Sequence, residues 1–259
     1  MNLKIINPIT YPGWDDLLLS NPDYSFFHSS SWARVLHESY NFKPLYFTLI
    51  KENKLLVLMP IMEVKNFIAG KKGVSLPFAD YVDPIVAEGS HINDVFDYLI
   101  EYGKKSSWKS IEIKGGEWLF QESPLSSYYY GHTLDLSQGE DQIFSNLRDS
   151  TRRNIKKAIK ADIKVEVCNT LASINEFYRL NCLTRKMHGL PPQPAFFLET
   201  YMTILFQGIL VLFCLLHIKR KLLQVPFIFI LEKRQYINMA LRIYNIRDSG
   251  QTTLLCGRP

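Results

Sequence analysis

The sequence lacks the short signatures of several large enzyme classes. It contains no G-x-x-x-x-G-K-[ST], G-x-G-x-x-G, H-E-x-x-H or G-x-S-x-G motif, so a P-loop, a dinucleotide site, a zincin site and an α/β-hydrolase nucleophile have no support. The six histidines are scattered without the spacing of metal ligands. The four cysteines lie far apart and form no C-x-x-C pair, which is typical of reduced thiols in a cytoplasmic protein.

Targeting segments and long apolar runs are also missing. No apolar stretch follows the first lysine, so no secretory signal is visible. The most apolar stretch, residues 202–216, is interrupted by Gln207 and Gly208 and is shorter than the roughly 20 residues that a membrane-spanning helix needs. We therefore expect a buried strand there and no transmembrane segment. A membrane anchor is the less favoured interpretation.

The chain does have enough apolar material for a packed core. Of its 259 residues, 47% are hydrophobic and 21% are charged, a composition that excludes disorder throughout. The hydrophobic periodicity alternates between helical and strand patterns in both halves of the chain. We therefore predict an α/β (α+β) fold built around mixed sheets.

The expected elements follow from this periodicity and from turn residues. In the first half they are a helix over residues 30–40 with Ser30 or Ser31 near its cap, a β-hairpin around residues 51–54, a turn at 70–73, a helix over 92–105, and strands at 110–116 and 131–137. In the second half they are one helix over 140–161 with an apolar side of Phe144, Leu147, Ile155, Ala158 and Ile159, a strand over 163–167, a helix from Asn169 or Thr170 to Met187, and a helix over 195–206.

The net charge of +5 is concentrated in one segment. Residues 148–164 contain seven basic and two acidic residues, a surplus that equals the charge of the whole chain. Five of the basic residues recur every fourth position, and like charges at that spacing destabilise a helix unless a partner compensates them. A phosphate group is the partner that guanidinium and ammonium groups bind best. A merely solvated helix face is the alternative, whereas a general nucleic-acid coat would spread its charge more widely.

Several short motifs occur in a fixed order between about residues 25 and 210. In the first half they are S-S-S-W-A-R-V-L (29–36) and L-P-F-A-D-Y-V-D-P (76–84), and in the second half S-T-R-R-N-I-K-K-A (150–158), I-K-V-E-V (163–167) and T-R-K-M-H-G-L-P (184–191). This series resembles the FemAB-like branch of the GNAT acyltransferase superfamily. The chain departs from the pattern at Val82-Asp83, where the branch usually has two glycines.

The resemblance implies two tandem GNAT-like domains, at residues 1–138 and 139–259, that share a groove. Members of the branch move an aminoacyl or other acyl group onto an amine in peptidoglycan cross-bridges or related cell-envelope chemistry. The implied co-substrate is an acyl donor, either aminoacyl-tRNA or acyl-CoA, with no permanently bound cofactor and no metal. The implied partners are a phosphate-bearing small molecule or the aminoacyl-tRNA. The alternative function is a non-catalytic protein that binds a polyanion or nucleic acid through the basic helix 148–164.

The resemblance also implies site residues. Amine attack on an acyl carbonyl needs orientation, a proton acceptor and stabilisation of the oxyanion. Asp80 is a candidate proton acceptor, with a turn residue as the alternative, and His188 is a second catalytic candidate for which a helix-end cap is the favoured interpretation. The substrate-binding candidates are Phe78 and Tyr81 in the groove, Arg152, Arg153, Asn154 and Lys157 toward phosphate, and Arg185 at the inter-domain edge.

The tail from about residue 210 does not continue the pattern of the branch. Its residues lack a convincing period, but a shifted reading of their codons permits I-I-A-G-A-I-F, K-Y-G-A-S-D and R-P-N-N-x-V-M-W, in that order. These strings resemble the missing elements of the branch. We therefore expect a shift of reading frame near residues 208–216, an intact first domain, a defective second domain and weak or absent catalysis.

The nucleotide sequence tests this expectation. We predict that the alternative frame beneath the last fifty or so codons encodes the three strings without an early stop. Early stops in that frame, or different peptides, would refute the shift of reading frame.

Overall fold

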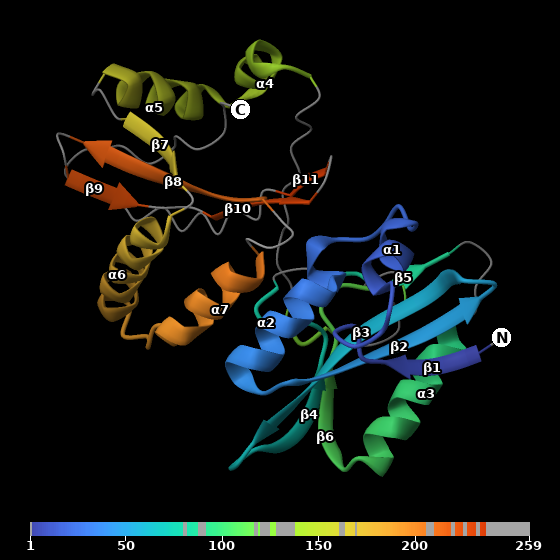
Figure 1. The fold of residues 1–259 in the computed structure, drawn as a ribbon. Helices are drawn as coiled ribbons and strands as arrows, with labels where there is room; N and C mark the ends of the chain where they lie inside the picture. The colour runs from blue at the N-terminus through green and yellow to red at the C-terminus, as the bar shows by residue number, and fades with distance from the viewer. Residues whose placement is uncertain are drawn as a thin grey trace. The chain divides into compact units, whose positions relative to one another are not determined.

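The computed structural model describes residues 2–79, 82–87, 92–116, 119, 125–127, 138–160, 164–168, 170–205, 210–218, 221–224, 227–231 and 234–236. The chain divides into two compact units (Figure 1). The first takes the described residues within Met1–Pro124, Gln193–Leu210 and Leu231–Tyr236, and the second takes those within Leu125–Pro192 and Val211–Ile230.

The first unit is built on a mixed sheet with the strand order β1-β2-β3-β4-β6. Its strands are β1 (Asn2–Ile6), β2 (Lys43–Lys51), β3 (Lys54–Asn66), β4 (Gly70–Val74), β6 (Trp108–Glu112) and the short β5 (Ile85–Val86), which pairs with β3. Neighbouring strands are antiparallel except for β4 and β6, which run parallel. The predicted α/β fold around a mixed sheet is therefore confirmed.

Helices cover both faces of this sheet (Figure 1). They are α1 (Trp14–Leu19), the 3-10 helix η1 (Phe26–His28), α2 (Ser30–Tyr40) and α3 (Ile92–Lys105). The unit also contains α7 (Ala195–Leu205). On one face, Val95 and Leu99 of α3 pack against Phe47 and its strand neighbours. On the other face, the ring of Trp14 in α1 meets Tyr46 edge-on at 5.5 Å, and α7 packs against α2.

The β2–β3 hairpin follows directly from the sequence. Residues 44–49 of β2 are all buried because alternate side chains point to the α3 face and to the α1–α2 face. A strand buried on both faces has a continuous apolar run instead of an alternating one. At the turn, Glu52 and Asn53 both have left-handed backbones, with φ of 49° and 58°, as a two-residue hairpin of type I′ requires. The predicted hairpin is confirmed.

Two predictions in the first unit are wrong in detail. The helix over 30–40 forms as predicted, but its N-cap is Ser29, whose hydroxyl accepts from the Trp32 N–H. Residues 70–73 form strand β4 and not a turn. The turn lies before them, where the Asn66 side chain accepts from two following backbone N–H groups. Gly73 is needed within β4, because a Cβ there would lie 2.3 Å from the ring of Trp108.

The second unit contains three helices and strands of a second sheet. Its elements are α4 (Glu140–Asn146), α5 (Asp149–Lys160), β7 (Lys164–Cys168), α6 (Leu171–Met187), β8 (Leu210–Ile218), β9 (Lys221–Gln224) and β10 (Phe227–Leu231). The strand order is β10-β8-β7, with β9 paired to β8. A short strand, β11 (Arg234–Tyr236), follows β10 along the chain. Among the described helices, none combines the length and the apolar character needed to cross a bilayer.

The predicted single helix over 140–161 is wrong. Leu147 has an extended backbone, with φ −67° and ψ 148°, so α4 ends there and α5 begins two residues later. The predicted apolar side is also wrong in part, because Ile159 is 67% exposed although Ala158 is buried. In contrast, the α6 prediction is confirmed, with Thr170 as the N-cap that accepts from the Ser173 N–H.

The apolar stretch 202–216 is divided between two elements. Its first residues complete α7, in which Phe197 and Thr200 are buried one helical turn apart. The strand predicted for the whole stretch begins only at Leu210, as β8. The predicted strand 131–137 lies outside the described residues.

Tyr46 provides a test of this packing. Its ring is fully buried, and its hydroxyl finds no hydrogen-bond partner among the residues that the structure describes. Burial accordingly raises the pKa of the phenol far above its ordinary value. Because an unsatisfied buried hydroxyl costs about 1–3 kcal/mol, we predict that Tyr46→Phe leaves the free energy of unfolding unchanged or raises it by about 1 kcal/mol. Urea denaturation measures this difference.

The neighbouring ring is the matched control. Phe47 is also fully buried, and Phe47→Ala removes packing without relieving an orphaned group, so we expect it to lose about 3–5 kcal/mol. A loss of more than about 1 kcal/mol in Tyr46→Phe would contradict the prediction and show that a buried water satisfies the hydroxyl.

Candidate functional site

The L-P-F-A-D-Y-V-D-P segment lies in the first unit, between β4 and β5. The structure describes it on both sides of Asp80 and Tyr81, which themselves lie outside the described residues. The flanking residues are held by side chains and backbone groups from other elements of the same unit. The described residues of this segment therefore form the candidate site of the first unit.

The backbone before Asp80 is unusual. Leu76 and Phe78 both have left-handed conformations, with φ of 40° and 67°, which for bulky residues cost about 1–3 kcal/mol each. The Ala79 N–H closes the turn by donating to the Leu76 carbonyl at 3.2 Å. Leu76 is fully buried, whereas Phe78 is 48% exposed. The turn thus holds the Phe78 ring at the surface at the cost of two unfavourable backbone conformations.

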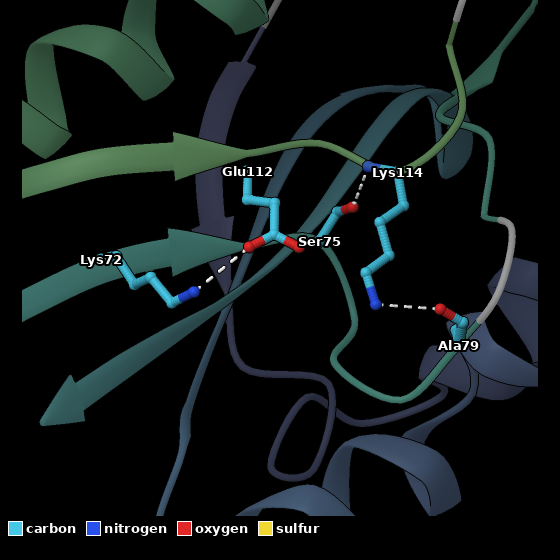
Figure 2. A network of polar contacts seen from close by, with 5 residues as sticks. All are labelled: Lys72, Ser75, Ala79, Glu112 and Lys114. Atoms are coloured by element: carbon cyan, nitrogen blue, oxygen red, sulfur yellow. Dashed lines mark hydrogen bonds and ion pairs between the residues drawn. The ribbon is translucent and has the colours of Figure 1, made fainter. Parts of the chain in front are cut away.

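Lys114 stabilises both ends of this turn, as Figure 2 shows. Its backbone N–H donates to Ser75 Oγ at 2.7 Å, and its Nζ reaches across to donate to the Ala79 carbonyl at 3.0 Å. The Ser75 N–H in turn donates to the Glu112 carbonyl at 2.8 Å. Lys72 belongs to the same network only through an exposed ion pair with Glu112, which contributes little to stability. Lys114 is therefore the residue that fixes the turn.

Aromatic rings hold Phe78 from the other side. Its ring lies 4.8 Å from that of Tyr40, at the end of α2, and 5.9 Å from that of Phe197 in α7. The Tyr40 ring also stacks on Phe42 at 5.3 Å. Phe78 therefore has a defined position although half of its surface is open to solvent.

The backbone after Tyr81 is fixed by a buried histidine. His28 Nδ1 accepts from the Ser25 N–H at 3.0 Å, so its Nε2 carries the proton and donates to the Asp83 carbonyl at 3.0 Å. Burial lowers the pKa of this imidazole to about 4, because charging it would require desolvating an imidazolium. His28 is thus a neutral tether between η1 and the candidate segment.

The departure at Val82-Asp83 has a structural explanation. Val82 is buried, and Asp83 Oδ1 accepts from the Gly116 N–H at 2.6 Å. The close approach is made by the opposite segment, where Gly115 has φ of 83° and a Cβ would lie 2.7 Å from Asp83 Oδ1. The close approach therefore needs no glycine at 82–83, where the resemblance places two. The glycine pair at 115–116 provides it from the opposite segment.

The arginine-rich motif lies on α5 in the second unit. Arg152 donates to the Ser145 carbonyl at 3.0 Å and pairs with Asp149, so it joins the end of α4 to the start of α5. This guanidinium holds the pKa of the Asp149 carboxyl below its ordinary value by hydrogen bonding to it. Arg153 and Lys157 are exposed, and Asn154 is half-buried. Arg152 therefore has a structural role that the sequence did not reveal.

Arg185 and His188 lie at the end of α6. His188 is the C-cap residue, as the favoured interpretation of the sequence predicted. Leu190 N–H donates to the Arg185 carbonyl at 2.9 Å, and Gly189 N–H donates to the Lys186 carbonyl at 3.1 Å. These are the two bonds of a Schellman motif. The catalytic role of His188 and the binding role of Arg185 stay predictions.

Comparison with known proteins supports the fold. No family model and no curated protein matches the sequence. Among solved structures, FemX superposes with a TM-score of 0.57 at 15% identity, over 83% of this chain and 57% of the FemX chain. This chain has the fold of FemX. The resemblance inferred from the motifs is thus confirmed at the level of the fold, and the chain spans little more than half the length of FemX.

A second solved structure is more distant. The ribosomal-protein-alanine N-acetyltransferase from Brucella melitensis biovar Abortus 2308 matches with a TM-score of 0.34 at 11% identity, over 52% of this chain and 100% of its own.

Sequence reasoning missed His28 and Lys114. His28 directly precedes the cap of α2, and Lys114 directly precedes the glycine pair that ends the strand predicted over 110–116. The glycine pair was the available signal for a close approach at that point. No sequence pattern around His28 indicates its role, because its partner Asp83 is 55 residues away.

The buried histidine predicts a specific pH dependence of stability. Its pKa is about 4 in the folded chain against an ordinary 6.5, so below pH 6.5 the unfolded chain takes up a proton that the folded chain does not. Stability therefore falls as the pH drops from about 7 to 4, by up to about 3 kcal/mol from this group. Urea unfolding across this range should show a shallower dependence in His28→Asn than in the wild type.

The control variant is His37→Asn, which makes the same substitution at an exposed histidine. An NMR titration of the His28 ring in the wild type tests the same point without a variant. A midpoint near 6.5, or equal slopes in wild type and His28→Asn, would contradict the prediction.

Proposed function

We propose that the chain is an acyltransferase that moves an aminoacyl or other acyl group onto an amine. The observation that carries this proposal is the FemX fold, together with the motif order of the FemAB-like branch on that fold. The strained turn adds support, because unfavourable backbone conformations persist where the surroundings hold them for function. The reaction is attack of a free amine on an activated acyl carbonyl.

The proposed reaction residues belong to the segment before β5 in the first unit. Asp80 is proposed to accept a proton from the attacking amine. It directly follows Ala79, whose carbonyl receives the Lys114 ammonium. Phe78 is proposed to contact the substrate through its exposed face, backed by Tyr40 and Phe197. Tyr81 keeps its predicted place among the substrate-binding residues.

The proposed phosphate-binding residues belong to the second unit. Arg153 and Lys157 are one helical turn apart on α5 and both are exposed, which suits a guanidinium and an ammonium group for phosphate oxygens. Asn154 and Arg185 are proposed to assist them. Arg152 acts mainly through the α4–α5 junction. The donor is proposed to be aminoacyl-tRNA or acyl-CoA, both of which carry phosphates, and the acceptor an amine of the cell envelope.

Donor binding by the purified full chain tests this proposal. Because a charge-assisted hydrogen bond contributes about 1.5–3 kcal/mol, we predict that Arg153→Ala with Lys157→Ala weakens saturable binding of acetyl-CoA or of an aminoacyl-tRNA by about tenfold or more. Lys54→Ala with Lys104→Ala removes the same charge from exposed positions of the first unit and should leave binding unchanged. Binding is the primary measurement, since the expected shift of reading frame predicts weak turnover.

Two results would count against the proposal. Equal losses in the two double variants would show a non-specific charge effect. Binding that grows with RNA length and never saturates with either donor would favour the alternative, a polyanion-binding protein. Where turnover is detectable, Asp80→Asn should abolish transfer while donor binding persists.

A further inference from the structure

The basic residues of α5 form one continuous face of the helix, because Lys156 and Lys160 are three and seven residues after Arg153. The proposed donor site uses Arg153 and Lys157. Arg148, Arg152, Lys156 and Lys160 follow one another at intervals of four residues and are here called the outer row. The Arg152 N–H donates to the Arg148 carbonyl at 3.0 Å, so the helical spacing includes Arg148. Arg148, Lys156 and Lys160 are exposed.

An aliphatic side chain lies within the outer row. Ile159 is three residues after Lys156 and seven after Arg152, positions that share one face of an α-helix. It is 67% exposed, whereas its neighbour Ala158 is 2% exposed and packs inward. Ile159 is therefore mostly outside the packed side of α5, and it presents a branched aliphatic group among cations.

The charge of the outer row is left largely uncompensated within α5. Asp149 is the one acidic residue between positions 148 and 160, and Arg152 already pairs with it. The face consequently attracts an anionic partner. The identity of that partner follows from Ile159, because phosphate alone gains nothing from an aliphatic neighbour.

A membrane surface fits the positive charge of the outer row and the exposed Ile159 side chain better than a nucleic acid does. Single-stranded nucleic acids are bound by stacking on aromatic side chains, and α5 contains none. An anionic bilayer takes ammonium and guanidinium groups at its headgroups and an aliphatic side chain at the acyl boundary beneath them.

We propose that the outer row of α5, together with Ile159, docks the second unit on an anionic phospholipid surface. Each cation near such a surface raises affinity by about fivefold, and insertion of one isoleucine by about tenfold. These gains give reversible peripheral binding. The proposal does not rest on the acyltransferase assignment, because vesicle binding is measured without any donor.

Flotation of the full chain with lipid vesicles tests it. The wild type should float with vesicles of phosphatidylglycerol and phosphatidylcholine, stay behind with pure phosphatidylcholine, and lose binding at high salt. Lys156→Gln with Lys160→Gln should weaken binding to the anionic vesicles by about twentyfold. Ile159→Ser should weaken it by about tenfold.

Matched controls separate docking from general charge and hydrophobicity. Ile68 is 94% exposed in the first unit, so Ile68→Ser makes the same change away from α5. Lys54→Gln with Lys104→Gln makes the same charge change. Both controls should bind like the wild type. The proposal is overturned if the wild type fails to float with anionic vesicles, if the controls lose as much binding as the α5 variants, or if bulk tRNA binds while vesicles do not.

Discussion

The β2–β3 hairpin must bury both of its faces, and the first unit is arranged around that requirement. Phe47 and its alternate neighbours need α3, whereas Tyr46 on the opposite face needs the aromatic layer of α1 and α2. Trp14 belongs to that layer, and its indole N–H donates to the His28 carbonyl at 3.1 Å. The core thereby fixes His28, and His28 fixes Asp83. Packing of one hairpin thus extends by direct contacts to the candidate segment.

The strained turn depends on the same arrangement. Left-handed conformations at Leu76 and Phe78 are unfavourable in isolation, so contacts with other parts of the chain have to stabilise them. Lys114 stabilises the backbone of the turn through two hydrogen bonds. The rings of Tyr40 and Phe197 hold the exposed phenyl group of Phe78. The turn is therefore a tertiary structure, held by Lys114 in the segment that follows β6 and by residues of α2 and α7.

Periodic features were the predictable part of this fold. Both helices of the first unit at 30–40 and 92–105, the hairpin and the cap at Thr170 follow from local spacing, and they form where expected. The strand at Gly70–Val74 was missed because glycine and lysine indicate a turn, while Trp108 across the sheet requires Gly73. The break at Leu147 was missed because the apolar spacing continues across it. His28 and Lys114 form hydrogen bonds with partners 55 and 35 residues away in the sequence. Local sequence patterns do not predict contacts at such separations.

The anchors of the candidate segment act mostly on its backbone. Lys114 binds the carbonyl of Ala79, and His28 binds the carbonyl of Asp83. Bonds of this kind hold the course of the chain without specifying which side chains it carries. This explains how Val82-Asp83 can stand where the resemblance places two glycines. The anchors keep the segment in place, the carboxylate of Asp83 adds a bond to Gly116, and Gly115 provides the close approach from the other side. The backbone position of the segment is thus specified by its anchors. The identity of its side chains can therefore vary without moving the backbone.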